Sequence, residues 1–137
     1  MKQVEEKATD KLKEIFGQTE EQLIADGWSI NGLAIYKGEG AWASGDGAVA
    51  DGDGAYAHGD GAHAHGDGAF AHGKNAYAEG EGAEARGDGA EAIGDGARAI
   101  GEDAAAHGEG AVASGDGARA KGDDAYADGE GARVTVL

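Results

Sequence analysis

The 137-residue chain contains no cysteine and no proline. Without cysteine there is neither a disulfide framework nor thiol chemistry. Without proline or a three-residue glycine period, a collagen triple helix is excluded. No apolar run approaches the roughly 20 residues that cross a bilayer, and the charged residues 1–10 lack the apolar centre of a secretory signal. We therefore expect no membrane insertion. Export, if it occurs, would use another route, such as assembly into a virion followed by lysis.

Basic residues are scarce, with 11 Lys and Arg against 27 Asp and Glu, and the formal net charge is −16. A nucleic-acid partner is not expected, because a protein that binds phosphates must neutralise them with Lys and Arg. The same charge disfavours anionic membrane surfaces. No nucleophile, base and orienting group stand together as a catalytic set would require, so we expect the protein not to be an enzyme and to need no cofactor.

Glycine, in contrast, is abundant, and most of it falls in a seven-residue repeat. Residues 38–135 consist of fourteen units such as GDGAFAH, in which Gly always stands first and Ala always fourth. The sixth position is Ala except for Val134, and the second is acidic except for Lys74. The third position is Gly, or else Asn75, Asp103 or Asp124. Only the fifth and seventh positions vary freely.

The exceptions at the third position indicate the backbone geometry, because Asn and Asp are the residues other than Gly that best tolerate left-handed angles. Between these turns Ala alternates with a variable residue at period two, which is typical of a strand. A helix is excluded by the glycine pairs. Two units, one for each side, close a flattened coil. We predict an all-β solenoid, a parallel β-roll over 38–137 with two seven-residue repeats per coil and alanines inside.

Residues 1–27 differ in character and predict a helical segment. An apolar stripe formed by Val4, Ala8, Leu12 and Ile15 predicts an amphipathic helix over about 2–16. Thr19 and Gln22 form a capping-box pattern for a short second helix over 20–25 that ends at Gly27. Residues 28–37 are β-prone and are expected to form a lead-in strand. The segment either caps the end of the solenoid or docks the protein to a larger particle.

The repeat resembles the YadA-like head domain of trimeric autotransporter adhesins, whose motif is Asn-Ser-Val-Ala-Ile-Gly and its variants. The similar stretches here are GAEAIG at 89–94, GARAIG at 96–101 and NAYAEG at 75–80. The resemblance implies a left-handed β-roll, small residues inside it, and a homotrimer of rolls packed side by side. A secretion signal, a coiled-coil stalk and a membrane anchor are not found. Similar repeats occur in bacteriophage fibres and virion surface proteins, a context that suits this chain better.

Alternate units fall on opposite faces of the predicted coil, and one face is richer in apolar and aromatic residues. This face is the predicted trimer interface, or alternatively a ligand-binding ladder, and it carries Trp42, Tyr56, Phe70, Ile100, Val112 and Tyr126. His58 and His72 lie on the same face, and Glu84, Arg86 and Arg98 interrupt it. The other face carries Val49, His63, His65, Tyr77, Ile93 and Ala105 among charged residues.

The acidic second positions form two ladders along the edges of the coil. The simpler interpretation is a solvated edge that keeps the rod soluble. Calcium binding is the alternative, with Asp46, Asp60 and Asp116 as candidate ligands, because Ca²⁺ prefers oxygen. The outward-facing His63 and His65 could form an exposed transition-metal site, although stacked surface histidines are the simpler expectation.

These observations predict a structural or adhesive virion surface protein: a phage short fibre, tip or capsid-decorating spike. The homotrimeric roll would project outward, and the N-terminal helices would bind a capsid or tail protein. One alternative is a bacterial cell-surface adhesin or carbohydrate-binding head that contacts a host receptor or glycan. The second alternative is a Ca²⁺-stabilised β-roll binding module.

Overall fold

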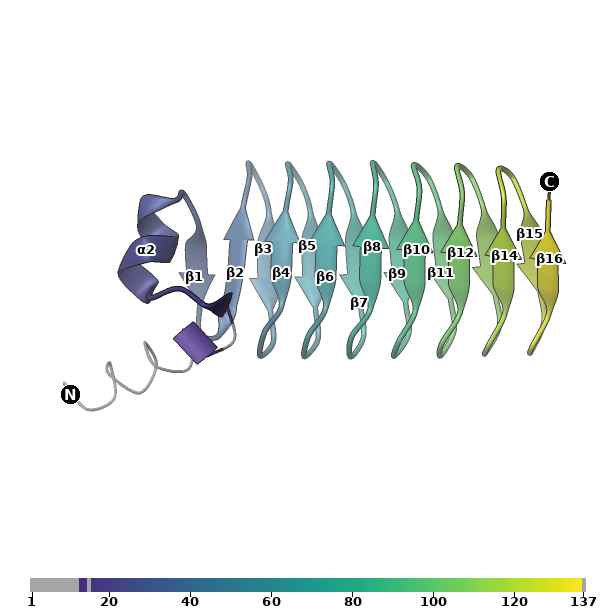
Figure 1. Ribbon diagram of the computed structural model, residues 1–137, viewed down its shortest axis with the longest axis horizontal. Helices are drawn as coiled ribbons and strands as arrows, with labels where there is room; N and C mark the ends of the chain where they lie inside the picture. The colour runs from purple at the N-terminus through teal and green to yellow at the C-terminus, as the bar shows by residue number, and fades with distance from the viewer. Residues whose placement is uncertain (1–12, 15, 137) are drawn as a thin grey trace.

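The computed structural model describes residues 13–14 and 16–136, which form an all-β solenoid of about seven coils with one short helix, α2 (Glu20–Ala25). Figure 1 shows the coils stacked in a straight row. One sheet has nine strands, in the order β1 (Ser29–Asn31), β2 (Ala34–Lys37), β4 (Val49–Asp51), β6 (His63–His65), β8 (Tyr77–Glu79), β10 (Glu91–Ile93), β12 (Ala105–His107), β14 (Arg119–Lys121) and β16 (Arg133–Thr135). The other has seven, β3 (Trp42–Ser44), β5 (Tyr56–His58), β7 (Phe70–His72), β9 (Glu84–Arg86), β11 (Arg98–Ile100), β13 (Val112–Ser114) and β15 (Tyr126–Asp128).

Successive strands from β2 onward alternate between the two sheets, and each pairs in parallel with the equivalent strand one coil away. Phe70, for example, pairs with Tyr56 on one side and Glu84 on the other. In Figure 1 the chain ascends the nearer sheet, descends the farther one and advances to the right, which is a left-handed path. The predicted β-roll with two repeats per coil is thereby confirmed, including its handedness.

The interior of the roll is made of alanine. Alanines at the fourth and sixth positions of the repeat are buried almost throughout, for example Ala90 and Ala92 at 0% exposure, and no polar or charged residue is buried among the described residues. Strands of three residues joined by tight turns place the two sheets too close together for larger side chains. Between its two ends the core therefore gains only methyl groups, and the larger apolar side chains are left on the outside. At the ends, Tyr36 and Val134 occupy inward positions and pack partly buried against the alanines.

The turns explain why glycine is kept at two positions of each unit. The third position has a left-handed backbone, and the residues other than glycine found there, Asn75, Asp103 and Asp124, have φ of 59–61°, as predicted. At the first position the reason is different. A Cβ on Gly87 (φ 122°) would lie 2.6 Å from the carbonyl oxygen of Gly101 in the next coil, so neither the angle nor the space admits a side chain.

The N-terminal end of the solenoid is closed by α2, whose predicted capping box is present. The Thr19 hydroxyl accepts from the backbone N–H of Gln22, and the Gln22 side chain accepts from that of Thr19. Leu23 of α2 is buried at 1% exposure, and it packs with Ile35 and Val49 against the first coils. The described part of this segment is therefore a cap.

The N-terminal end departs from the expected structure in one element. Residues 28–37, expected as one lead-in strand, form instead an antiparallel hairpin of β1 and β2, in which Ile30 pairs with Ile35. Gly32, at φ 62°, allows the two-residue loop between them. The stripe of the first predicted helix, Val4, Ala8, Leu12 and Ile15, lies outside the described residues. Within residues 13–14 and 16–136, no helix has the length and apolarity needed to cross a membrane.

Candidate functional site

Outward side chains come from the fifth and seventh positions of each unit, and they form straight files along each sheet because parallel strands stack in register. We call the outward side chains of the odd-numbered strands from β3 to β15 the seven-stranded face. Those of the even-numbered strands from β2 to β16 are called the nine-stranded face. All six residues predicted as an interface or ligand surface lie on the seven-stranded face. Five of them, Trp42, Tyr56, Phe70, Val112 and Tyr126, occupy its fifth-position file, and Ile100 occupies the seventh-position file.

At the N-terminal half of this face the aromatic rings contact one another. Tyr56 and Phe70 stack with ring centroids 5.1 Å apart and planes 8° apart. Beside them His58 and His72 meet edge to face at 4.9 Å. Trp42 continues the file and is 43% exposed. Stacked, partly exposed rings of this kind form a flat apolar surface that can be covered by another molecule.

A charged group divides the seven-stranded face in the middle. Oε1 of Glu84 lies 3.0 Å from Nε of Arg86 and 3.8 Å from a guanidinium nitrogen of Arg98. The Arg86 guanidinium lies over the Phe70 ring, 5.1 Å from its centroid. The predicted ladder is thus two apolar areas, one on each side of these ion pairs. Beyond them Tyr126 is 58% exposed.

On the nine-stranded face a smaller cluster joins β6 to β8. The Tyr77 ring lies 6.2 Å from the ring of His63 and 6.0 Å from that of His65, and the Tyr77 hydroxyl donates to Oε2 of Glu79 at 3.1 Å. Burial, and then the proximity of His65, lowers the pKa of His63 below its ordinary value. Burial and the bond to Glu79 raise the pKa of Tyr77.

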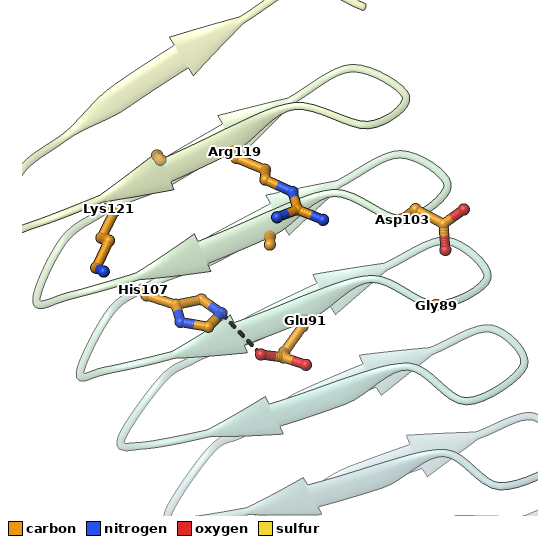
Figure 2. Close-up of a pocket in the computed structure, with 8 residues that line it drawn as sticks. Gly89, Glu91, Asp103, His107, Arg119 and Lys121 are labelled. Atoms are coloured by element: carbon orange, nitrogen blue, oxygen red, sulfur yellow. Dashed lines mark ion pairs between the residues drawn. The ribbon is translucent and has the colours of Figure 1, made fainter. Parts of the chain in front are cut away.

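The same face is hollowed where its fifth-position file reaches Ala105. The hollow has a volume of about 570 Å³ and is lined by Gly89, Glu91, Asp103, Ala105, His107, Arg119, Ala120 and Lys121. Figure 2 shows Arg119 and Lys121 on one flank, with Glu91 and His107 joined on the other. Nε2 of His107 lies 2.7 Å from Oε1 of Glu91, an ion pair when the imidazole is protonated. We call this feature the charged hollow.

The acidic edges are hydrogen-bond ladders. Where the second position holds Asp, Oδ1 can accept the backbone N–H of the equivalent residue in the preceding coil, as Asp60 does from Asp46 (3.1 Å) and Asp116 from Glu102 (3.1 Å). Seven such bonds occur among the described residues, and in each of them the acceptor is Asp rather than Glu. In the same part of the chain, no three His, Cys, Asp or Glu side chains group closely enough to hold a metal ion.

Sequence reasoning missed the charged hollow and the selectivity of the edge ladder for Asp. The hollow had a signal, because Ala105 is the one alanine among the fourteen fifth positions. A single alanine among varied residues, however, does not by itself indicate a hollow. The ladder had a weaker signal, since Asp and Glu are mixed at the second position and both satisfy an acidic pattern.

The comparisons with known proteins agree with this geometry. The family model of the YadA head domain repeat, in two copies, matches residues 38–50, 50–76, 92–118 and 106–127. Together these segments cover more than half of the chain and lie entirely within the solenoid. The search of curated proteins found no match.

Proposed function

We propose, from the premise that the chain belongs to the YadA head domain repeat family, that it is the adhesin-like head of a homotrimeric surface protein. Three β-rolls would pack side by side through their seven-stranded faces and leave their nine-stranded faces outside. The observation that carries this proposal is the file of Trp42, Tyr56 and Phe70, which lie in register on successive coils. The rings of Tyr56 and Phe70 stack, Trp42 is 43% exposed, and the other two are partly exposed in the single chain. No enzymatic activity is proposed.

The distribution of charge supports this choice of face. The seven-stranded face carries two acids, Glu84 and Asp128, and two bases, Arg86 and Arg98, so its net charge is zero. The nine-stranded face carries seven charged side chains, Lys37, Asp51, Glu79, Glu91, Arg119, Lys121 and Arg133. Thirteen of the fourteen second positions at the edges are acidic. Contact between edges would bring like charges together, whereas the flat neutral sheets can approach.

The core gives a second reason for assembly. Alanine methyls bury little apolar area per residue, and small single cores of this kind gain stability by oligomerisation. Burial of the exposed rings between subunits contributes roughly 25 cal/mol per Å² of apolar surface. The trimer therefore adds the apolar burial that the interior of each roll lacks.

Light scattering after size exclusion tests the assembly. The expected mass is about three times the 13.6 kDa of the chain, with and without a chelator. The double substitution Tyr56→Glu and Phe70→Glu should give a monomer with an unchanged circular dichroism spectrum. The roll accepts carboxylates in this file, because Glu84 already occupies the next position.

The matched control is Tyr77→Glu with Ile93→Glu on the nine-stranded face, where Glu91 and Glu79 occupy equivalent positions. This variant should stay trimeric. A trimer that survives the first pair of substitutions and is lost in the second would assign the interface to the opposite sheet. A monomeric wild-type protein would overturn the assembly itself.

For the surface that carries this head, we propose a virion, with a bacterial cell surface as the alternative. Residues 1–12 precede the described cap, whose packing includes Phe16, and deleting them leaves the described residues of the cap in the chain. In purified virions the full-length chain should be present, and the deletion variant should be absent while remaining trimeric in solution. A truncated protein that still enters virions would contradict docking through this segment, and recovery only on the cell envelope would favour the alternative.

A further inference from the structure

The charged hollow exists because a single small residue interrupts a file of large ones. Ala105 lies between Glu91 and Arg119 in the fifth-position file of the nine-stranded face. The long side chains on both sides form walls, and the methyl group forms the floor. The resulting volume of about 570 Å³ is within the range of small-molecule sites. The fold accepts a larger residue there, because Tyr77 occupies the same file two coils earlier.

One wall of the hollow is basic, in a protein whose net charge is −16. Arg119 and Lys121 reach into it from β14, and Arg133 follows in the next coil. The three ion pairs among the described residues use Arg86, Arg98 and His107. Within that part of the chain, Arg119 and Lys121 are thus left without an acidic partner. Two adjacent cations on one strand can bind a carboxylate through charge-assisted hydrogen bonds.

The opposite wall offers acceptors instead. Glu91 contributes carboxylate oxygens, and Asp103 lies at the turn beside Gly89 (Figure 2). His107 lies beside this carboxylate, with its Nε2 2.7 Å from Oε1 of Glu91. Carboxylates accept hydrogen bonds from hydroxyl groups and repel a second anion. The hollow therefore presents a cationic side on β14 and a hydroxyl-accepting side on β10, with β12 between them.

We propose that the charged hollow binds one acidic sugar, a pyranose with a single carboxylate and several hydroxyls. Its carboxylate would contact Arg119 and Lys121, and its hydroxyls would contact Glu91 and Asp103. Extended polyanions are disfavoured, because the acidic edges on both sides of the sheet repel them. This inference deepens the proposed adhesin-like function by naming a ligand class, and it places the ligand on the face opposite the proposed subunit interface.

The test is titration of the full-length protein, followed by NMR or calorimetry, with 3′-sialyllactose as the acidic probe. Lactose serves as the neutral probe and a heparin-derived hexasaccharide as the polyanionic one. The expected result is saturable binding of sialyllactose and none of lactose. Ala105→Tyr, which fills the hollow, should abolish binding, and Arg119→Ala should weaken it about tenfold or more through loss of a charge-assisted bond.

Two matched controls separate this site from general effects. His63→Tyr places the same side chain in the same file three coils away, and Lys74→Ala removes a cation from the turn edge. Both should bind as the wild type does. Unchanged binding in Ala105→Tyr, an equal response to lactose, or stronger binding of the heparin fragment would overturn the proposal. The mass of each variant is measured in parallel, so that a failed binding site is distinguished from a failed trimer.

Discussion

The hydrogen bonds between successive coils depend on small differences between side chains. At the acidic second position, the difference between Asp and Glu decides whether a bond forms. Asp carries its carboxylate one methylene closer to the backbone than Glu does. This reach lets Asp116 accept the N–H of Glu102 in the preceding coil at 3.1 Å, whereas no bond of this kind ends on a Glu in the described residues. The ladder along the edge is therefore discontinuous, with bonds only where Asp stands.

Exchanging Asp and Glu at the second position should change stability without changing charge. Asp116→Glu should lower the free energy of unfolding by about 0.5 kcal/mol, because one exposed hydrogen bond to a backbone N–H is lost. Glu102→Asp should raise it by a similar amount, since the new carboxylate can accept from Asp88. Urea denaturation of both variants at one pH measures the difference. Shifts of the same sign in both variants would contradict the ladder.

The backbone geometry of a repeat position could be predicted from the sequence where some units carry a different residue at that position. The left-handed third position was predictable because Asn75, Asp103 and Asp124 replace glycine there. The first position admits no exception among the fourteen units, so its sequence offered no contrast to interpret. Its cause, the close approach of successive turns such as Gly87 and Gly101, depends on stacking between coils and became visible only in three dimensions.

At the scale of the elements, neighbouring strands bring together ionisable side chains that lie two repeat units apart in sequence. His63 on β6 packs against Tyr77 on β8 and lies beside His65. Burial and the neighbouring imidazole lower the pKa of His63 from 6.5. In the unfolded chain the group has its ordinary pKa and takes up a proton more readily. The folded protein should therefore lose stability from this site as pH falls below about 6.5.

The substitution His63→Gln should remove this part of the pH dependence. Between pH 7.5 and pH 5.0 the free energy of unfolding of the wild type should fall by more than that of the variant, because carboxylate titration is common to both. Chemical denaturation at the two pH values measures both differences. Parallel losses in the two proteins would show that His63 is not coupled to folding.

Local signals predicted the helix well and the hairpin poorly. The capping box of Thr19 and Gln22 is a short-range pattern, and the helix it predicted has the expected bounds, Glu20–Ala25. The hairpin of β1 and β2 also had a local signal, because glycine at the first loop position, here Gly32, favours a two-residue turn. The continuous β-prone run around it suggested a single strand. The turn residue outweighed the propensity of its neighbours.

In the whole molecule, each repeat unit forms one side of a coil, and alternate units place their outward side chains on opposite sheets. Deleting two units, for example 87–100, should leave a shorter roll in which every remaining side chain keeps its own face. Deleting one unit, for example 87–93, should also leave a roll, because every remaining unit keeps its glycines and alanines. The downstream side chains, Val112 and Tyr126 included, then move to the opposite sheet.

The two deletions should therefore separate folding from assembly. Both should keep the β spectrum in circular dichroism. The two-unit deletion should keep the trimeric mass, and the one-unit deletion should weaken the trimer, since its seven-stranded face loses its C-terminal apolar area. Unfolding of the one-unit deletion would show that the sheets are not interchangeable, and a trimer of equal stability in both deletions would contradict the proposed interface.

Periodicity alone predicted most of the architecture, because every coil repeats one backbone and contacts only its neighbours. The six residues expected on one face do share it. What they contact in an assembly is not encoded in the repeat, since the fifth and seventh positions vary and no single chain shows its partner. The charged hollow escaped prediction for a related reason, because it depends on the order of three residues, Glu91, Ala105 and Arg119, in a file spanning three coils.

The uneven packing of the molecule also governs when each part forms. Large apolar side chains are buried at the N-terminal cap, where Leu23 meets Ile35 and Val49, and alanine alone fills the coils beyond. An isolated alanine coil buries little apolar surface on closing, so the first stable nucleus is expected at the cap. Each later coil then closes on the template of the coil before it. A growing polypeptide can form its roll from the first coil onward while the rest is still being synthesised. The coils then form in the same N- to C-terminal order in which translation produces them.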